Sequence, residues 1–212
     1  MMFLRERCRA NEPLDFLEYI EGTPEQQFIN TGVAVNFQNA RIECKWSIWT
    51  TGAHVNYVPI FGNFIDEDAP VTRLILRDTD THYRLNFNNP ASSSISTGTV
   101  TFYEGSDNPN TIELRRTRYY SNDNDAYYTI SPSGLSYTND APMIICGARG
   151  YTLDNYMNYR VRIYYFRIKQ SSTLLGNFVP CRRGSSVGMY DRVSDRFLGN
   201  AGVGSFVAGP AV

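Results

Sequence analysis

Residues 160–210 read RVRIYYFRIKQSSTLLGNFVPCRRGSSVGMYDRVSDRFLGNAGVGSFVAGP, and this stretch decides the fold class. It opens with a strand over 161–169, rich in β-branched and aromatic residues. Apolar side chains fall on both faces of this strand, which predicts either a central strand of a sheet that is packed on both sides or a bulge that exchanges the faces. Short strands separated by turns follow, ending near residues 180, 190, 198 and 208. They leave no room for a helix, so the sequence predicts an all-β chain.

Upstream, residues 41–49 alternate cleanly between apolar and polar side chains. Ile42, Cys44, Trp46 and Ile48 share one face of the expected strand. Trp46 is therefore predicted to lie in the core. Trp49 is out of phase with it, so Trp49 is the tryptophan that could be exposed.

The rest of the chain reads as further short strands and turns, with no repeat and no second domain. The first strands are expected at 16–20 and 27–31, another at 57–65, and a buried one at 143–146. Three hairpins are expected: 73–77 with 83–88, 100–103 with 111–116, and 119–120 with 126–130.

Several segments resemble concanavalin A-like (laminin-G-like) jelly-roll domains of tailed-phage and gut-bacterial surface proteins. They are LEYIEGTPEQQFINTGV from Leu17, MIICGARG from Met143, and IYYFRI, NFVPCRR, VGMYDRVSDRFLGNAG and GSFVAGP in the closing stretch. The resemblance spans residues 17–210. It implies an antiparallel jelly-roll β-sandwich of the concanavalin A-like lectin/glucanase fold. It says much less about function, because this fold is shared by lectins, hydrolases and assembly modules.

Composition excludes several classes of function. The formal net charge of −1 argues against nucleic-acid binding, and no apolar run is long enough for a membrane span. The N-terminal residues show no signal peptide. Cys8, Cys44, Cys146 and Cys181 form no C-x-x-C pair, so we expect reduced and mostly buried thiols.

The basic residues are unevenly divided between the two types. Lys45 and Lys169 are the only lysines among 20 basic residues, and the chain also carries 15 tyrosines. Arginine and tyrosine are enriched at protein interfaces. Codon bias explains the same composition equally well.

No pattern for catalysis stands out. Retaining glucanases of this superfamily carry alternating carboxylates along one strand, and no strand here has them. Asp66, Glu67 and Asp68 read as a solvated turn, and His54 and His82 as surface residues outside any triad. We therefore expect no enzyme, no metal and no cofactor. Calcium stays open as an alternative, because Ser106–Asn110 and Ser121–Asp125 offer oxygen ligands, although hairpin turns favour the same residue types.

Glycan binding needs an exposed aromatic ring beside polar groups. Two regions offer this combination: residues 49–57 and the loop at 149–159. The candidate carbohydrate-binding residues are Trp49, His54, Tyr57, Arg149, Tyr151, Asn155 and Tyr156. The simpler alternative, which we favour here, is that these side chains pack loops onto the sandwich or contact other proteins.

The leading functional hypothesis is a non-enzymatic phage virion protein, of capsid or tail, that is assembled in the host cytoplasm. Residues 1–14 are then a docking arm for other virion proteins, and residues 15–212 form the jelly roll, displayed as a homo-oligomer with glycans as candidate ligands. The second hypothesis is a free-standing carbohydrate-binding module, and the third is a glycoside hydrolase. The arm and the missing signal peptide favour the first over the second; the missing strand carboxylates count against the third.

Overall fold

The structure of the chain is a computed structural model. It describes residues 12–23, 26–36, 38–50, 57–63, 71–77, 82–89, 92–96, 100–101, 109–115, 118–121, 126–129, 138–139, 141–147 and 159–212. Every strand pairing in these residues is antiparallel, and no helix occurs in them. The prediction of an all-β chain is confirmed for this part of the sequence.

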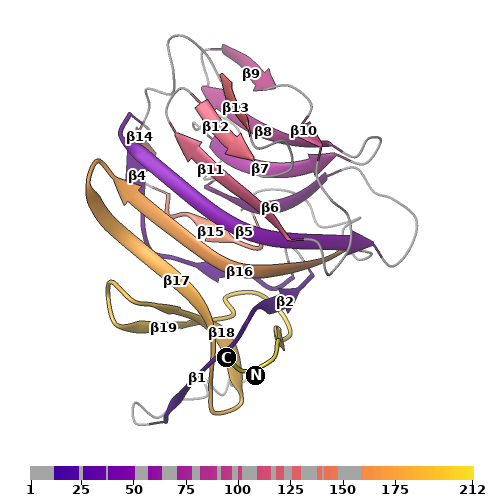
Figure 1. The fold of residues 1–212 in the computed structure, drawn as a ribbon, viewed down its shortest axis with the longest axis vertical. Coiled ribbons are helices and arrows are strands. Elements are labelled where there is room, and N and C mark those ends of the chain that lie inside the picture. The colour runs from indigo at the N-terminus through magenta and orange to yellow at the C-terminus, as the bar shows by residue number, and fades with distance from the viewer. Residues whose placement is uncertain are drawn as a thin grey trace, which may run out of the picture.

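The strands form two large sheets and a small one (Figure 1). The 11-stranded sheet has the order β13-β12-β11-β5-β16-β17-β18-β19, with β1, β2 and β20 added at its side. Its strands are β1 (Leu14–Phe16), β2 (Ile20–Gly22), β5 (Ala40–Thr50), β11 (Asn110–Arg115), β12 (Arg118–Ser121), β13 (Ala126–Thr129), β16 (Tyr159–Gln170), β17 (Thr173–Arg183), β18 (Ser186–Asp191), β19 (Arg196–Gly199) and β20 (Val207–Ala208).

The 7-stranded sheet has the order β10-β8-β7-β6-β15-β3, with β9 paired to β8. Its strands are β3 (Ile29–Asn30), β6 (Tyr57–Asn63), β7 (Val71–Arg77), β8 (His82–Asn89), β9 (Ser92–Ser96), β10 (Val100–Thr101) and β15 (Ile144–Ile145). The small sheet pairs β4 (Val35–Asn36) with β14 (Thr138–Asn139).

One hydrophobic core joins the two large sheets. The Phe61 ring from β6 lies 5.3 Å from the Phe166 ring from β16, and both side chains are fully buried. The inward residues of β5 belong to the same core, among them Trp46 at 0% exposure, as its phase predicted. Two antiparallel sheets that share a core in this way are consistent with a β-sandwich.

β16 lies inside the 11-stranded sheet, since it pairs with both β5 and β17, but only one of its faces packs on the core, so of the two predicted alternatives the bulge is the one found. Figure 1 shows β5 and β16 running side by side across the sheet. The register between them shifts between Ile163 and Tyr165, which is a β-bulge. Val161 and Ile163 before the bulge and Phe166 and Ile168 after it are all buried. The bulge therefore explains why apolar residues occupy both alternation phases of this strand.

Two details of the predicted strands are corrected. Residues 100–103 and 111–116 do not form a hairpin, because β10 pairs with β8 in one sheet and β11 pairs with β5 and β12 in the other. The connection between them is long enough to cross from sheet to sheet, so adjacency in sequence misled the prediction. The first strands are also shorter than expected, at Leu14–Phe16, Ile20–Gly22 and Ile29–Asn30.

The closing segment is held by two side chains from the motif quoted above. Asp191 is 3% exposed, and its carboxylate accepts hydrogen bonds from the backbone N–H groups of Asn177, Val193 and Ser194 and from the Ser194 hydroxyl. Asn200 accepts from the N–H groups of Phe28 and Gly202 and donates to the Gly204 carbonyl. These residues therefore have structural roles.

Candidate functional site

The candidate site lies on the face of the 11-stranded sheet that points away from the core. Along β5, the polar residues alternate with the apolar core residues, so they share this outer face; they are Arg41, Glu43, Lys45 and Ser47. The pairing of β5 with β11 and β16 places further charged residues beside them: Glu113, Arg115, Arg160, Arg162, Arg167 and Lys169. The strands thus form a polar platform on a rigid support.

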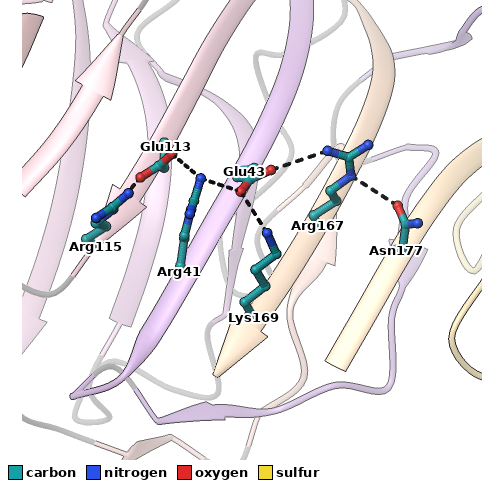
Figure 2. Close-up of polar contacts among 7 residues, drawn as sticks. All are labelled: Arg41, Glu43, Glu113, Arg115, Arg167, Lys169 and Asn177. Atoms are coloured by element: carbon teal, nitrogen blue, oxygen red, sulfur yellow. Dashed lines mark hydrogen bonds and ion pairs between the residues drawn. The ribbon is translucent and has the colours of Figure 1, made fainter. Parts of the chain in front are cut away.

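Ion pairs cross this platform from β11 to β16 (Figure 2). Glu113 is the register partner of Glu43, and the Arg41 guanidinium lies 2.6 Å from one Glu113 oxygen and 2.9 Å from one Glu43 oxygen. Arg115 pairs with the other Glu113 oxygen. Lys169 and Arg167 each lie 3.5 Å from a Glu43 oxygen. All four carboxylate oxygens therefore have a cationic partner, and we name this set the ion-pair network.

A groove of about 400 Å³ opens next to the network on the same face. We name it the tyrosine groove; its lining residues are Glu18, Tyr19, Lys45, Pro109, Arg162, Tyr164 and Pro210. The rings of Tyr19 and Tyr164 meet edge to face at 5.6 Å between centroids. The Lys45 ammonium lies 5.2 Å from the centre of the Tyr164 ring. Partly exposed rings, cations and a carboxylate thus line one cavity.

Arg162 is fixed in this groove by several contacts. Its guanidinium stacks over the Tyr19 ring at 4.2 Å and donates to Glu21 from 3.2 Å. Burial lowers the pKa of Arg162. The hydrogen bond and charge of Glu21, together with Tyr19 and Tyr164, raise this pKa by more than burial lowers it, so the net shift is upward. Arg162 is thus a permanent, oriented cation.

Tyr165 also lies on β16, opposite Lys45. Burial raises the pKa of its hydroxyl, which stays neutral.

Two hydroxyl contacts help to fix the residues around the groove. The Tyr164 hydroxyl lies 3.3 Å from the Ser47 hydroxyl, close enough to share a hydrogen bond. The Arg160 guanidinium donates to the Thr23 hydroxyl at 3.0 Å on the other side of Arg162. The groove therefore combines aromatic surface with oriented donors and acceptors, which can bind a polar ligand with apolar faces.

None of the residues proposed from sequence is among the described residues that line the groove. Trp49 belongs to β5, opposite Arg160, and Tyr57 begins β6 in the other large sheet, opposite Arg77. His54, Arg149, Tyr151, Asn155 and Tyr156 lie outside the described residues, as do the side chains of Trp49 and Tyr57. Their assignment as carbohydrate-binding residues stays a prediction.

The tyrosine groove itself was missed by the sequence reasoning. Tyr19, Lys45 and Tyr164 come from three segments that are distant in the chain. The alternation of β5 does put Lys45 on the outer face, which is a usable signal. Tyr164 could not be placed from sequence, because the bulge next to it shifts the phase of β16.

The remaining predictions concern metals, arms and membranes. Among the described residues, no three His, Cys, Asp or Glu side chains gather as a metal site. Most of Ser106–Asn110 and Ser121–Asp125, all of Asp66–Asp68, and residues 1–11 of the arm lie outside those residues. Leu14, at the end of the arm, pairs with Arg183. The described part of the chain contains no helix with the length and hydropathy of a membrane span.

Comparison with known proteins leaves the geometry of the site as the basis for assigning a function. No protein-family model and no curated protein matches this chain. The outer face of the sheet carries an aromatic groove next to a network of ion pairs. The proposal below starts from that surface.

Proposed function

We propose that the chain is a non-enzymatic, lectin-like phage virion protein that contacts glycans through the tyrosine groove. The observation that carries the proposal is the juxtaposition of Tyr19 and Tyr164 with Lys45 and Arg162 in a cavity of about 400 Å³. Sugars have apolar C–H faces that pack on aromatic rings and hydroxyls that need charged or polar partners. Both kinds of partner are available in this one groove.

The volume and position of the groove suit a short stretch of glycan. A cavity at the lower end of the usual range for ligand pockets takes one or two sugar units and leaves the rest of a chain on the surface. Three of the lining residues, Lys45, Arg162 and Tyr164, lie on the paired strands β5 and β16, so the sheet holds them rigidly. Rigid partners lower the entropy cost of binding.

The state of the two carboxylates supports a non-enzymatic role. A retaining glycosidase needs one carboxylate as a nucleophile and one carboxylic acid as a proton donor. Glu43 and Glu113 are opposite one another, but each oxygen is ion-paired with an arginine or lysine. The oxygens of both carboxylates are thus in contact with cations of the protein itself. The network therefore supports the platform, and it is a poor hydrolase site.

The jelly-roll fold and the virion location form the finer part of the proposal. They rest on the resemblance of residues 17–210 to phage and gut-bacterial domains, with two antiparallel sheets around one core as the supporting architecture. In this proposal residues 1–14 dock on other virion proteins and the domain is displayed as a homo-oligomer. A free-standing carbohydrate-binding module is the second candidate, since the groove suits it equally well.

A glycan array with matched variants tests the proposal. Tyr19→Ala combined with Tyr164→Ala should weaken binding by about tenfold, since each stacked ring contributes on the order of 1 kcal/mol. Tyr190→Ala is the matched control, because Tyr190 packs on Phe16 outside the groove. Trp49→Ala with Tyr156→Ala tests the loop residues proposed from sequence in the same assay.

Three outcomes would overturn parts of the proposal. Absence of any bound glycan would make the groove a protein interface. Equal losses of glycan binding in the groove variant and in Tyr190→Ala would show that the substitutions act through the stability of the domain and not through the groove. A glycan-cleaving activity that disappears in Glu43→Gln or Glu113→Gln would replace the lectin-like reading with a hydrolase.

A further inference from the structure

Positive charge is concentrated on the outer face of β5, β11 and β16, although the whole chain has a formal net charge of −1. Both lysines of the chain lie there. The cations of the face are Arg41, Lys45, Arg115, Arg160, Arg162, Arg167 and Lys169. The carboxylates on it or at the rim of the groove are Glu18, Glu21, Glu43 and Glu113. Cations therefore outnumber carboxylates among these described residues.

The carboxylates of the face are also the more deeply buried partners. The Glu43 and Glu113 side chains are 11% and 12% exposed, whereas those of Arg41, Arg167 and Lys169 are 36%, 42% and 34% exposed. A ligand that approaches from solvent meets the cations first. A basic surface above a low-dielectric sheet attracts anions.

The cations Arg41, Arg167 and Lys169 lie along β5 and β16 at increasing distance from the tyrosine groove. Lys45 lines the groove, and Arg41 lies four residues back along β5, roughly 14 Å away at about 3.4 Å per residue. On β16, Arg167 and Lys169 are the register partners of Glu43 and Arg41. The groove and the network thus form one continuous track along two adjacent strands.

Two residues on this track present groups suited to carboxylates. Among the described residues Lys45 contacts the Tyr164 ring and pairs with no carboxylate. The Arg167 guanidinium stacks on the Tyr165 ring at 4.8 Å and donates to Asn177, which orients its planar donors. Oriented guanidinium groups bind carboxylates in a bidentate way.

We propose that this track binds an acidic polysaccharide, with one sugar in the tyrosine groove and carboxylates of the following units on Lys45, Arg167 and Lys169. The inference rests on the proposed function of the groove and specifies its ligand class. A nucleic acid fits less well, because a duplex carries about one charge per 1.7 Å of its axis, a denser row of charge than the cations of the track. Uronic-acid polymers carry a single carboxylate per sugar.

The experiment compares an oligogalacturonate with its carboxyl-reduced counterpart by titration calorimetry, at about 50 mM and about 300 mM salt. The acidic form should bind at least tenfold more tightly, and its affinity should fall as the salt rises. Lys45→Gln and the double variant Lys45→Gln with Arg167→Gln should progressively remove that preference. Arg182→Gln is the matched control, since Arg182 pairs with Asp15 at an exposed site on β17.

Folding is controlled separately. Lys45 has no carboxylate partner among the described residues, so Lys45→Gln should keep the melting temperature of the wild type. Loss of the acidic preference in this single variant cannot then be attributed to the network.

The other results separate this inference from the proposed function. Equal, salt-independent binding of both oligosaccharides would overturn the acidic track and leave the glycan groove intact. Binding of neither oligosaccharide, nor of any glycan on an array, would overturn both. Tighter binding of a DNA duplex than of the oligogalacturonate would also overturn the inference, in favour of a polyphosphate ligand.

Discussion

Glu113 lies directly opposite Glu43 across the pairing of β11 with β5, two like charges held face to face on one sheet. Like charges in this arrangement destabilise a sheet unless a cation lies between them. The Arg41 guanidinium contacts both carboxylates, at 2.6 Å and 2.9 Å. Arg41 is therefore the cation of the ion-pair network that bridges the two carboxylates.

The first prediction concerns Arg41. Arg41→Gln should lower the free energy of unfolding by about 2 kcal/mol, because it leaves two poorly exposed carboxylates facing one another. Adding Glu113→Gln to the variant should restore much of the loss, since it removes one of the two like charges. Urea unfolding of the single and double variants measures this coupling.

A matched control separates the network from ordinary surface charge. Arg182→Gln removes an ion pair whose partners are 44% and 52% exposed, and should change stability by less than about 0.5 kcal/mol. Equal effects of Arg41→Gln and Arg182→Gln would contradict the role of Arg41.

The second prediction concerns the acid stability of the closing segment. Burial raises the pKa of Asp191, but hydrogen bonds from Asn177, Ser194 and Val193 outweigh it and hold that pKa below its usual value. The carboxylate therefore stabilises the fold above the unfolded pKa of about 3.9, and this contribution is lost as the pH falls through the lower folded value.

Asp191→Asn should consequently cost about 1–3 kcal/mol of unfolding free energy near neutral pH. The difference from wild type should shrink as the pH is lowered past the folded pKa. Unfolding titrations at several pH values measure it, with Asp195→Asn in the exposed turn as the control. A difference that does not vary with pH would show that the ionised carboxylate is not what matters.

The third prediction uses two glycines that face each other across β18 and β19. Gly188 and Gly199 are register partners, yet a Cβ on Gly188 would lie 2.2 Å from the Leu198 carbonyl oxygen, whereas a Cβ on Gly199 would lie 3.6 Å from the Phe197 ring. Gly188→Ala should destabilise by about 1–3 kcal/mol and Gly199→Ala should be tolerated. Thermal unfolding of both variants compares them; similar melting temperatures would contradict the register of β18 and β19.

Strand phase is what could be predicted from the sequence. Alternation along one strand is local, so the inward position of Trp46 and the outward positions of Arg41 and Glu43 followed from residues 41–49 alone. Apolar residues in both phases of β16 left two alternatives open, a sheet packed on both sides or a bulge, and the structure contains the bulge.

Strand partnership is what could not be predicted. Glu43 and Glu113 are 70 positions apart, and nothing local says that β11 pairs with β5 instead of with β10. The hairpin error and the missed network have this one cause. The tyrosine groove was hidden for a related reason, because Tyr19, Lys45 and Tyr164 meet only after β2, β5 and β16 have paired.

The last prediction concerns the thiols. Cys44, Cys146 and Cys181 are buried, and none of them forms a disulfide within the described part of the chain. Burial, with a smaller contribution from Cys146, raises the pKa of the Cys44 thiol well above its ordinary value, and burial raises the pKa of Cys181 to about 12 even though Arg183 acts in the opposite direction. At a pH of about 8.5 these two thiols stay protonated, and thiolate is the reactive form.

A thiol reagent should therefore leave Cys44, Cys146 and Cys181 unmodified in the native protein and label them rapidly after denaturation. Mass spectrometry of the labelled chain counts the modified sites. Cys8 should also be labelled in the denatured, unreduced chain, because the sequence predicts that all four cysteines are reduced. Two missing sites in that sample would reveal a disulfide, and rapid labelling of Cys44 in the native protein would contradict its position in the core between the two sheets.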